Sequence, residues 1–185
     1  MYYHNVDLLK YFNNIGLTET IPEKYLEGEL TLGNSSIPCD KLSFRNLHFY
    51  KNVPFLISKN KNYQDNMELQ GQTLIINKKK VKRLHFLSCS CYGDYQFSIY
   101  INGVVERTTT TKDFVYYDGT NFNDNKEIYC WHKFPHMNTQ NGKNTVYDTA
   151  IWYTYICLEK PTDIEKIVFD DIPLVHIFSI TLEGD

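Results

Sequence analysis

The sequence predicts an all-β fold, an antiparallel β-sandwich of the jelly-roll type. Apolar residues recur at every second position along much of the 185-residue chain, and a period of two indicates half-buried strands. Turn-forming residues separate these runs, which gives roughly eight to ten short strands without alternating helices. Aromatic residues make up 15% of the chain, with Tyr 15 and Phe 11, and such residues favour strands. At this length we expect one domain, residues 1–185, with residues 1–40 as an N-terminal extension or covering segment.

The first half of the chain contains one helix candidate and several strand candidates. Residues 7–16, DLLKYFNNIG, are compatible with a short helix that ends at Gly16 and equally with extended chain. Strands are expected, in order, at residues 42–49, 53–57, 73–77 and 82–89. A basic run at residues 78–83 separates the last two. We interpret it as a solvated hairpin end or sheet edge, where lysines discourage edge pairing, in preference to a phosphate-binding patch.

The strongest local signal is a hairpin at residues 94–110. In the first strand, DYQFSIYI, one face carries Tyr95, Phe97, Ile99 and Ile101. Asn102-Gly103 follows at once, and VVERTTT comes next. Two β-rich runs joined by Asn-Gly predict a hairpin, because a type I′ turn needs positive φ at both central residues.

Three more strands are expected towards the C-terminus. The runs at 151–158 and 164–169 are separated by KPTD, residues 160–163, which indicates a turn. The run LVHIFSITL alternates cleanly, so one face should carry Leu174, His176, Phe178, Ile180 and Leu182. Because His176 sits in this apolar row, we expect a hydrogen-bonded core histidine and not a catalytic base.

Charge and cysteine usage narrow the classes of function. The net charge of −3 argues against a nucleic-acid partner, and the absence of any run of about 18 apolar residues argues against a membrane span. The N-terminal residues do not have the pattern of a signal peptide. Five cysteines, an odd number, argue against a fully paired disulfide framework. We therefore expect reduced thiols and a cytoplasmic protein, unless the chain is a segment of a larger secreted protein.

Three segments in order carry a resemblance to a known superfamily. They are DNMELQGQTLI from residue 65, HMNTQNG leading into the strand IWYTYICLEK, and the closing IEKIVFDDIPLVHIFSITLE. Over most of residues 40–182 this order resembles the galactose-binding-like β-sandwich modules appended to many bacterial glycoside hydrolases. Met67 stands where those modules usually have Val, and residues 104–128 match poorly. Such modules mostly bind carbohydrate or accompany a catalytic domain, so the resemblance implies a galactose-binding-like fold and does not specify an activity.

The stretch YCWHKFPHMNTQNG, which starts at Tyr129, holds the main candidate residues. In an extended strand Cys130 and His132 point to one side and Trp131 to the other. The proline then ends regular pairing, so His136 lies in a loop. Cys130, His132 and His136 are candidate zinc ligands. Their spacing matches no standard zinc motif, and we favour the structural interpretation.

The same stretch offers a carbohydrate site. Such a site needs an aromatic plate for the apolar face of a pyranose and planar hydrogen-bonding groups for its hydroxyls. Trp131 is the candidate plate if its ring faces outward, whereas an inward ring would belong to the core, as would Trp152. Binding residues gather in loops carried by a rigid sandwich. The candidate ligand-binding residues are Trp131, His132, His136, Asn138, Asn141 and Asp148.

Two acidic segments are weaker candidates. Asp65 and Asn66 offer oxygens of the kind that calcium takes, but a turn in which the side chain bonds the nearby backbone is favoured. Asp170 and Asp171 lie between two expected strands. Adjacent side chains diverge in extended chain, so this pair is poorly placed for glycoside hydrolysis.

The sequence therefore favours a non-catalytic ligand-recognition module, with carbohydrate as the leading ligand class and no catalytic residue. One alternative is a small metal-dependent jelly-roll enzyme that uses His132 and His136. Another is an accessory domain whose Tyr-rich sheet face packs on a partner. The expected partners are a carbohydrate or small polar ligand, and a catalytic protein or a second copy of the chain, but neither nucleic acid nor membrane. No cofactor is expected, and structural calcium or zinc are the metal alternatives.

Overall fold

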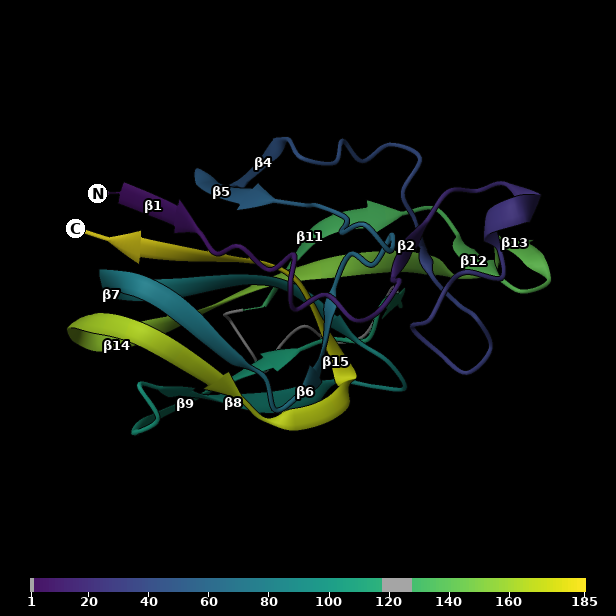
Figure 1. Cartoon of the computed structure of the whole chain (residues 1–185). Coiled ribbons are helices and arrows are strands. Elements are labelled where there is room, and N and C mark those ends of the chain that lie inside the picture. Colours follow the sequence, from purple (N-terminus) through teal and green to yellow (C-terminus); the bar gives the residue numbers. More distant parts are fainter. Residues whose placement is uncertain (1, 118–127) are drawn as a thin grey trace.

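A computed structural model describes residues 2–117 and 128–185 of the chain (Figure 1). Its elements are β1 (Tyr2–Asn5), β2 (Leu17–Thr18), the 3-10 helix η1 (Pro22–Lys24), β3 (Ile37–Pro38), β4 (Leu47–Tyr50), β5 (Val53–Leu56), β6 (Met67–Gln70), β7 (Thr73–Ser90), β8 (Tyr95–Ile101), β9 (Val105–Thr111), β10 (Val115–Tyr116), β11 (Tyr129–Phe134), β12 (Met137–Thr139), β13 (Gly142–Asn144), β14 (Asp148–Phe169) and β15 (Asp171–Gly184). All these strand pairs are antiparallel except β2 with β3.

The main sheet has nine strands, six of them in the order β1-β15-β7-β14-β8-β9. Its three longest strands, β7, β14 and β15, have 18, 22 and 14 residues, and β7 and β14 curve together through the molecule (Figure 1). The two faces of β7 serve different apolar cores. Leu84 and Phe86 join a first core with residues of β6 and β8, whereas Leu87 and Cys89 join a second core with residues of β5 and β11.

Strands β2, β3 and β5 pack on the second core. Leu17, Ile37 and Phe55, from β2, β3 and β5, are each 0% exposed within it. β1 pairs with β15, with Tyr2 opposite Gly184. The two ends of the chain therefore lie side by side (Figure 1).

The predicted hairpin at Asn102-Gly103 is confirmed as β8 and β9. Asn102 has φ 54° and Gly103 φ 76°, as a type I′ turn requires. The Asn102 side chain also docks the hairpin on β14, because its Oδ1 accepts the Glu165 N–H (2.9 Å) and its Nδ2 donates to the Asp163 carbonyl (2.8 Å). The turn is thus fixed by local conformation and by a long-range contact.

Two expected chain breaks are wrong. Residues 73–77 and 82–89 belong to the single strand β7, and residues 151–158 and 164–169 belong to the single strand β14. The register between these strands shifts between Cys157 and Thr162, so Pro161 lies in a bulge that needs no ladder hydrogen bond from it. The proline therefore interrupts the pairing without ending the strand.

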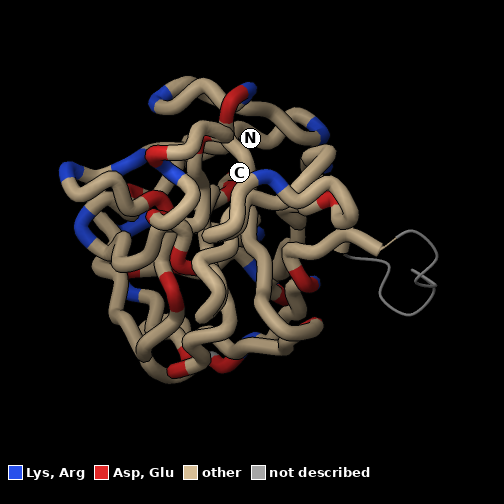
Figure 2. The backbone as a smooth tube through the Cα atoms, turned by 90° about the vertical axis from the view of Figure 1, so that its right-hand side faces the viewer, with Lys and Arg blue, Asp and Glu red and all other residues tan. Residues whose placement is uncertain are grey.

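The basic run at residues 78–83 is not a hairpin end, since it lies inside β7 and pairs with β14 on one side. On the other side the described pairing with β15 stops at Arg83, so residues 78–82 do form a sheet edge, as expected. Lys78 Nζ is 3.4 Å from an Asp163 oxygen and 3.7 Å from a Glu165 oxygen. Lys82 lies 3.4 Å from Glu183. Figure 2 shows Lys and Arg interspersed with Asp and Glu along the backbone, so carboxylates across the sheet offset the charge of this run.

The expected single face of β15 is also wrong, because a register shift between Ile177 and Ser179 resets the alternation. Ile177 and Ile180 share the first core, and Phe178 lies in the second. His176 is 1% exposed, and its Nδ1 donates to Asn66 Oδ1 at 2.9 Å. This confirms a hydrogen-bonded core histidine, and burial lowers its pKa to about 3.

The helix candidate at residues 7–16 forms a single turn, in which the Leu8 carbonyl accepts from the N–H groups of Tyr11 and Phe12. Just after this turn the chain lies against β6, because Asn13 Nδ2 donates a hydrogen bond to the Glu68 carbonyl. Leu8 and Phe12 are buried in the first core. Tertiary contacts therefore override the local helical pattern, a common outcome for weak propensity.

All five cysteines are free thiols, in line with the expectation of reduced thiols. Cys39, Cys89 and Cys91 are buried, Cys130 is half-buried and Cys157 is exposed. In the described ranges no helix combines the length and the apolar character needed to cross a bilayer.

Candidate functional site

A pocket of about 310 Å³ lies between the chain after β3 and the end of β11. Its lining residues are Pro38, Asp40, Lys41, His132, Lys133, Phe134, Pro135 and His136. Two of the predicted site residues, His132 and His136, therefore share one hollow. The opposite wall comes from Asp40 and Lys41, which sequence reasoning missed.

A β-bulge shapes the β11 wall. Cys130 pairs with Trp152 and His132 pairs with Ile151, so Trp131 is the extra residue in the ladder. The predicted alternation of Cys130 and His132 against Trp131 is therefore wrong. Cys130 and Trp131 are both half-buried against the second core, whereas His132 is exposed. The bulge turns His132 to the pocket.

The Trp131 ring is neither core nor an exposed plate. It meets the His48 ring edge-on, with ring centroids 5.7 Å apart and an interplanar angle of 87°. The centroid of the His132 ring also lies 5.7 Å from that of Trp131, and the His132 and Phe134 ring centroids are 4.5 Å apart. A row of rings thus runs from β4 to the pocket.

Hydrogen bonds link Asp40, Thr20 and His136 and so connect the two segments that line the pocket. Asp40 Oδ1 accepts the Thr20 N–H at 3.0 Å, and Oδ2 accepts the Thr20 hydroxyl. The hydroxyl has one proton and gives it to the carboxylate, so the Thr20 oxygen accepts from His136 Nε2 at 2.9 Å. His136 is therefore protonated on Nε2, and its buried Nδ1 has no hydrogen-bond partner in the described structure.

The pKa values of this chain of groups agree with that arrangement. Burial favours a higher pKa for Asp40, but the hydrogen bonds from Thr20 outweigh it and hold the pKa below the usual value. Burial lowers the pKa of His136, and nearby Lys143 adds to the effect. Asp40 is thus ionised and His136 neutral at pH 7.

The remaining polar groups at the pocket are basic. Lys133 Nζ lies 2.7 Å from Asp148 Oδ2. Lys41 and His132 are exposed, and within the described residues neither forms a hydrogen bond or ion pair. The pKa of His132 is lowered by burial and then by the neighbouring His48 and Lys41. Of the two lysines that line the pocket, Lys41 is therefore the one without an ion pair in the described structure.

The other predicted ligand-binding residues lie outside the pocket lining. Asn138 is 0% exposed, and its Nδ2 donates to the Thr18 hydroxyl (3.0 Å) and carbonyl (3.2 Å). Asn141 is exposed in the turn between β12 and β13. Asp148 begins β14 and reaches the pocket only through its ion pair with Lys133. Asn138 thus has a structural role next to the site, because its buried side chain binds Thr18.

The candidate metal ligands are not brought together. In the parts of the chain that the structure describes, no group of three His, Cys, Asp or Glu side chains is placed to hold a metal ion. Asp65 and Asn66 are each 0% exposed. The Asp65 oxygens accept the N–H groups of Gly16 (2.9 Å) and Leu17 (3.0 Å). These two residues fasten β6 to the N-terminal segment through long-range contacts, and not through the local turn that we favoured.

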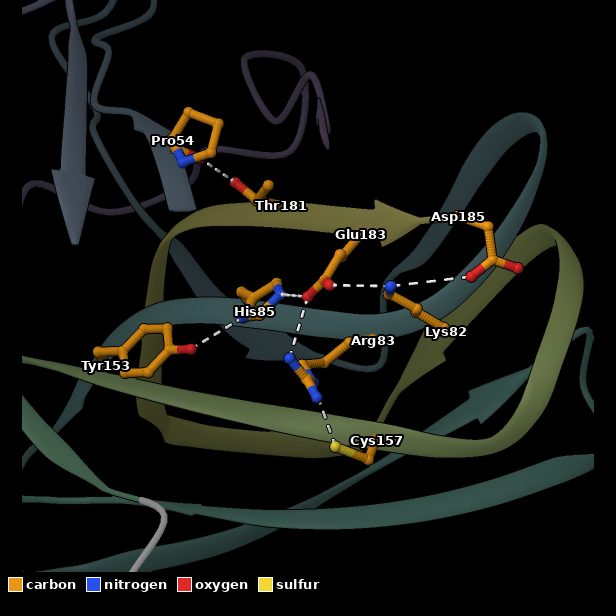
Figure 3. Close-up of polar contacts among 9 residues, drawn as sticks. All are labelled: Pro54, Lys82, Arg83, His85, Tyr153, Cys157, Thr181, Glu183 and Asp185. Carbon is orange, nitrogen blue, oxygen red and sulfur yellow. Dashed lines mark hydrogen bonds and ion pairs between the residues drawn. The ribbon is translucent and has the colours of Figure 1, made fainter. Parts of the chain in front are cut away.

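A second polar cluster, not anticipated from the sequence, lies on the second-core face of β7, β14 and β15 (Figure 3). Glu183 Oε2 accepts from His85 Nε2 (2.9 Å) and from Arg83 (3.2 Å). His85 Nδ1 therefore accepts from the Tyr153 hydroxyl at 2.9 Å. Burial lowers the pKa of His85, although Glu183 opposes the shift. Since His85, Tyr153 and Glu183 are all buried, the cluster ties three central strands together.

Comparison with known proteins places this geometry in a family. No curated protein matches the chain. The family described as the AziU2-like beta-sandwich domain matches residues 3–185, and this match together with the antiparallel sheets confirms the predicted all-β sandwich. The matched region is nearly the whole chain, and the chain therefore belongs to the AziU2-like beta-sandwich domain family.

Proposed function

We propose that this domain is a non-catalytic module that recognises a small polar ligand of the carbohydrate class in the pocket between residues 38–41 and 132–136. The pocket itself carries the proposal, because it joins an apolar wall of Phe134 and two prolines to the polar groups of His132 and Lys41. Ligand sites combine such walls with a few placed polar groups, at volumes from about 300 Å³ upward. A pocket of about 310 Å³ suits one sugar ring.

Two further features support carbohydrate as the ligand class. The resemblance of residues 40–182 to galactose-binding-like modules points to a superfamily in which sugars are common ligands. The ring row of Trp131, His132 and Phe134 supplies aromatic surface beside the hydrogen-bonding groups. Sugars offer an apolar ring face and hydroxyls together, so both kinds of group would be used.

The lining residues favour binding over hydrolysis. Asp40 is the one carboxylate among the pocket's described lining residues, and Thr20 engages both of its oxygens. Glycoside hydrolysis uses a pair of carboxylates on either side of the bond that breaks. The metal-dependent alternative lacks support from a third ligand near His132 and His136, within the residues that the structure describes.

The test is an NMR titration of the ¹⁵N-labelled domain with a panel of monosaccharides. A binding sugar should shift the amide signals of residues 38–41 and 132–136, and His132→Ala should weaken its binding about five- to tenfold, as expected for one lost hydrogen bond. His4→Ala is the matched control, since His4 lies in β1 and outside the pocket. Shifts confined to another surface, or none with any sugar, would contradict the proposal.

One observation favours a second function, the docking of a partner protein. Leu47 and Phe49 on β4 are 52% and 65% exposed, and among the described strands β4 pairs only with β5, in a two-stranded sheet. Adjacent exposed apolar side chains of this size are typical of interaction surfaces. Light scattering on the wild type and on Leu47→Ser/Phe49→Ser would test self-association through this hairpin, and a monomer in both cases would argue against a homodimer.

A further inference from the structure

The acidic side chains next to the pocket are already engaged within the protein. Thr20 occupies both oxygens of Asp40, and Lys133 contacts Asp148 at 2.7 Å. The ion pair neutralises Lys133, whereas Thr20 is uncharged and leaves Asp40 its negative charge. Both carboxylates therefore already have partners within the protein.

The basic side chains outnumber these carboxylates. Lys41 lines the pocket, and in the described structure it has no ion-pair or hydrogen-bond partner. His132 lines the same pocket and interacts electrostatically with Lys41 and His48. Lys143 acts in the same way on His136. The pocket thus presents an ammonium group and an imidazole that form no ion pair or hydrogen bond within the described residues.

We propose that Lys41 and His132 receive an oxyanion of the ligand, so that the pocket takes an acidic sugar, with a carboxylate or phosphate group, in preference to a neutral one. This inference rests on the proposed function. A carboxylate or phosphate oxygen only accepts hydrogen bonds, and Lys41 and one N–H of His132 only donate them. Charge-assisted bonds of this kind are about twice as strong as neutral ones. Phe134 and the prolines then face the ring of the sugar.

The titration state of His132 supports the same placement. Burial lowers the pKa of His132, and His48 and Lys41 lower it further, because each of them disfavours the positively charged imidazolium. An oxyanion between Lys41 and His132 reverses this effect and raises the pKa of His132. Binding of an acidic ligand near pH 6 should therefore be accompanied by uptake of a fraction of a proton.

The experiment compares sugars that differ only at C6, by isothermal titration calorimetry on the whole chain. The pairs are galactose with galacturonate and glucose with glucuronate, and glucose 6-phosphate distinguishes phosphate from carboxylate. Each preferred acid should bind about tenfold more tightly than its neutral partner, equivalent to one charge-assisted hydrogen bond. Lys41→Gln should abolish that preference, so that the acid and its neutral partner bind with equal affinity.

Lys61→Gln is the matched control, because Lys61 is an exposed lysine outside the pocket, and it should keep the preference. Thermal melting of both variants checks that they fold. Equal affinity for acid and neutral sugar in the wild type would overturn the inference and leave the proposed function standing. If no sugar of either kind binds, both fail. A preference that survives Lys41→Gln would also overturn the role of Lys41.

Discussion

Acidification should destabilise the domain through His176, and the size of the effect follows from its burial. His176 is 1% exposed, and burial lowers its pKa from 6.5 to about 3. In the unfolded chain the imidazole takes up a proton below pH 6.5, while in the folded state it stays neutral until about pH 3. The stabilisation from the neutral folded form is therefore complete above pH 6.5 and is lost as the pH falls.

The magnitude at pH 4 follows from these two pKa values. Protonation favours the unfolded chain about 290-fold at that pH, which corresponds to about 3 kcal/mol. Asp65 acts in the opposite direction, because burial raises its pKa to about 7 in spite of its hydrogen bonds. The folded state then binds the extra proton below pH 7, so this carboxyl adds stability as the pH falls. Only a comparison of variants separates the two contributions.

The variant for that comparison is His176→Asn. Its Nδ2 can replace His176 Nδ1 as donor to Asn66 Oδ1, it does not titrate, and Asp65 is retained. Urea denaturation at pH 7 and pH 4 should show that the wild type loses about 3 kcal/mol more of its free energy of unfolding than the variant does. An NMR titration should find the His176 ring neutral down to about pH 4. Parallel losses in both proteins, or a ring that titrates near 6.5, would refute the reasoning.

Three other predictions concern stability and thiol access. Glu183→Gln should lower the free energy of unfolding by about 2–3 kcal/mol, because Glu183 is 1% exposed and accepts from His85 and Arg83. Glu159→Gln removes an exposed ion pair with Arg107 and should cost under about 0.5 kcal/mol, so equal losses in urea titrations would contradict the buried role of Glu183. Gly103→Ala should cost about 1 kcal/mol, since Gly103 has φ 76°, and an unchanged denaturation midpoint would count against the type I′ turn. In the folded protein a thiol reagent should modify the exposed Cys157 fastest, and the buried Cys39, Cys89 and Cys91 should react only on unfolding. The fast phase of the reaction should disappear in Cys157→Ser.

Local signals explain which parts of the fold could be predicted. The Asn102-Gly103 hairpin is encoded by two residues that adopt positive φ readily, so neighbouring sequence suffices. The continuity of β7 and β14 is not local. Pro161 and the basic run resemble the ends of strands, and only their pairing across the sheet shows that a bulge accommodates the proline. The phase change at Phe178 has the same origin.

The candidate site likewise has one part that the sequence predicts and one part that it does not. His132 and His136 stand out within a short, unusual stretch, so their side of the pocket could be predicted. Thr20, which orients His136, lies 116 residues away in the sequence. No pattern around Asp40 and Lys41 distinguishes them from other loop residues. The missing half of the pocket depends on tertiary contacts that sequence spacing does not encode.

The bulge at Trp131 connects the fold to the proposed site. In a regular strand Trp131 would face away from both of its neighbours. The extra residue instead lets Cys130 and Trp131 pack on the second core together. His132 consequently turns outward beside Lys41, and Phe134 closes the pocket behind it. Bulges re-aim side chains at sheet edges and next to functional sites, and here a single inserted residue turns an imidazole into the pocket that Lys41 also lines.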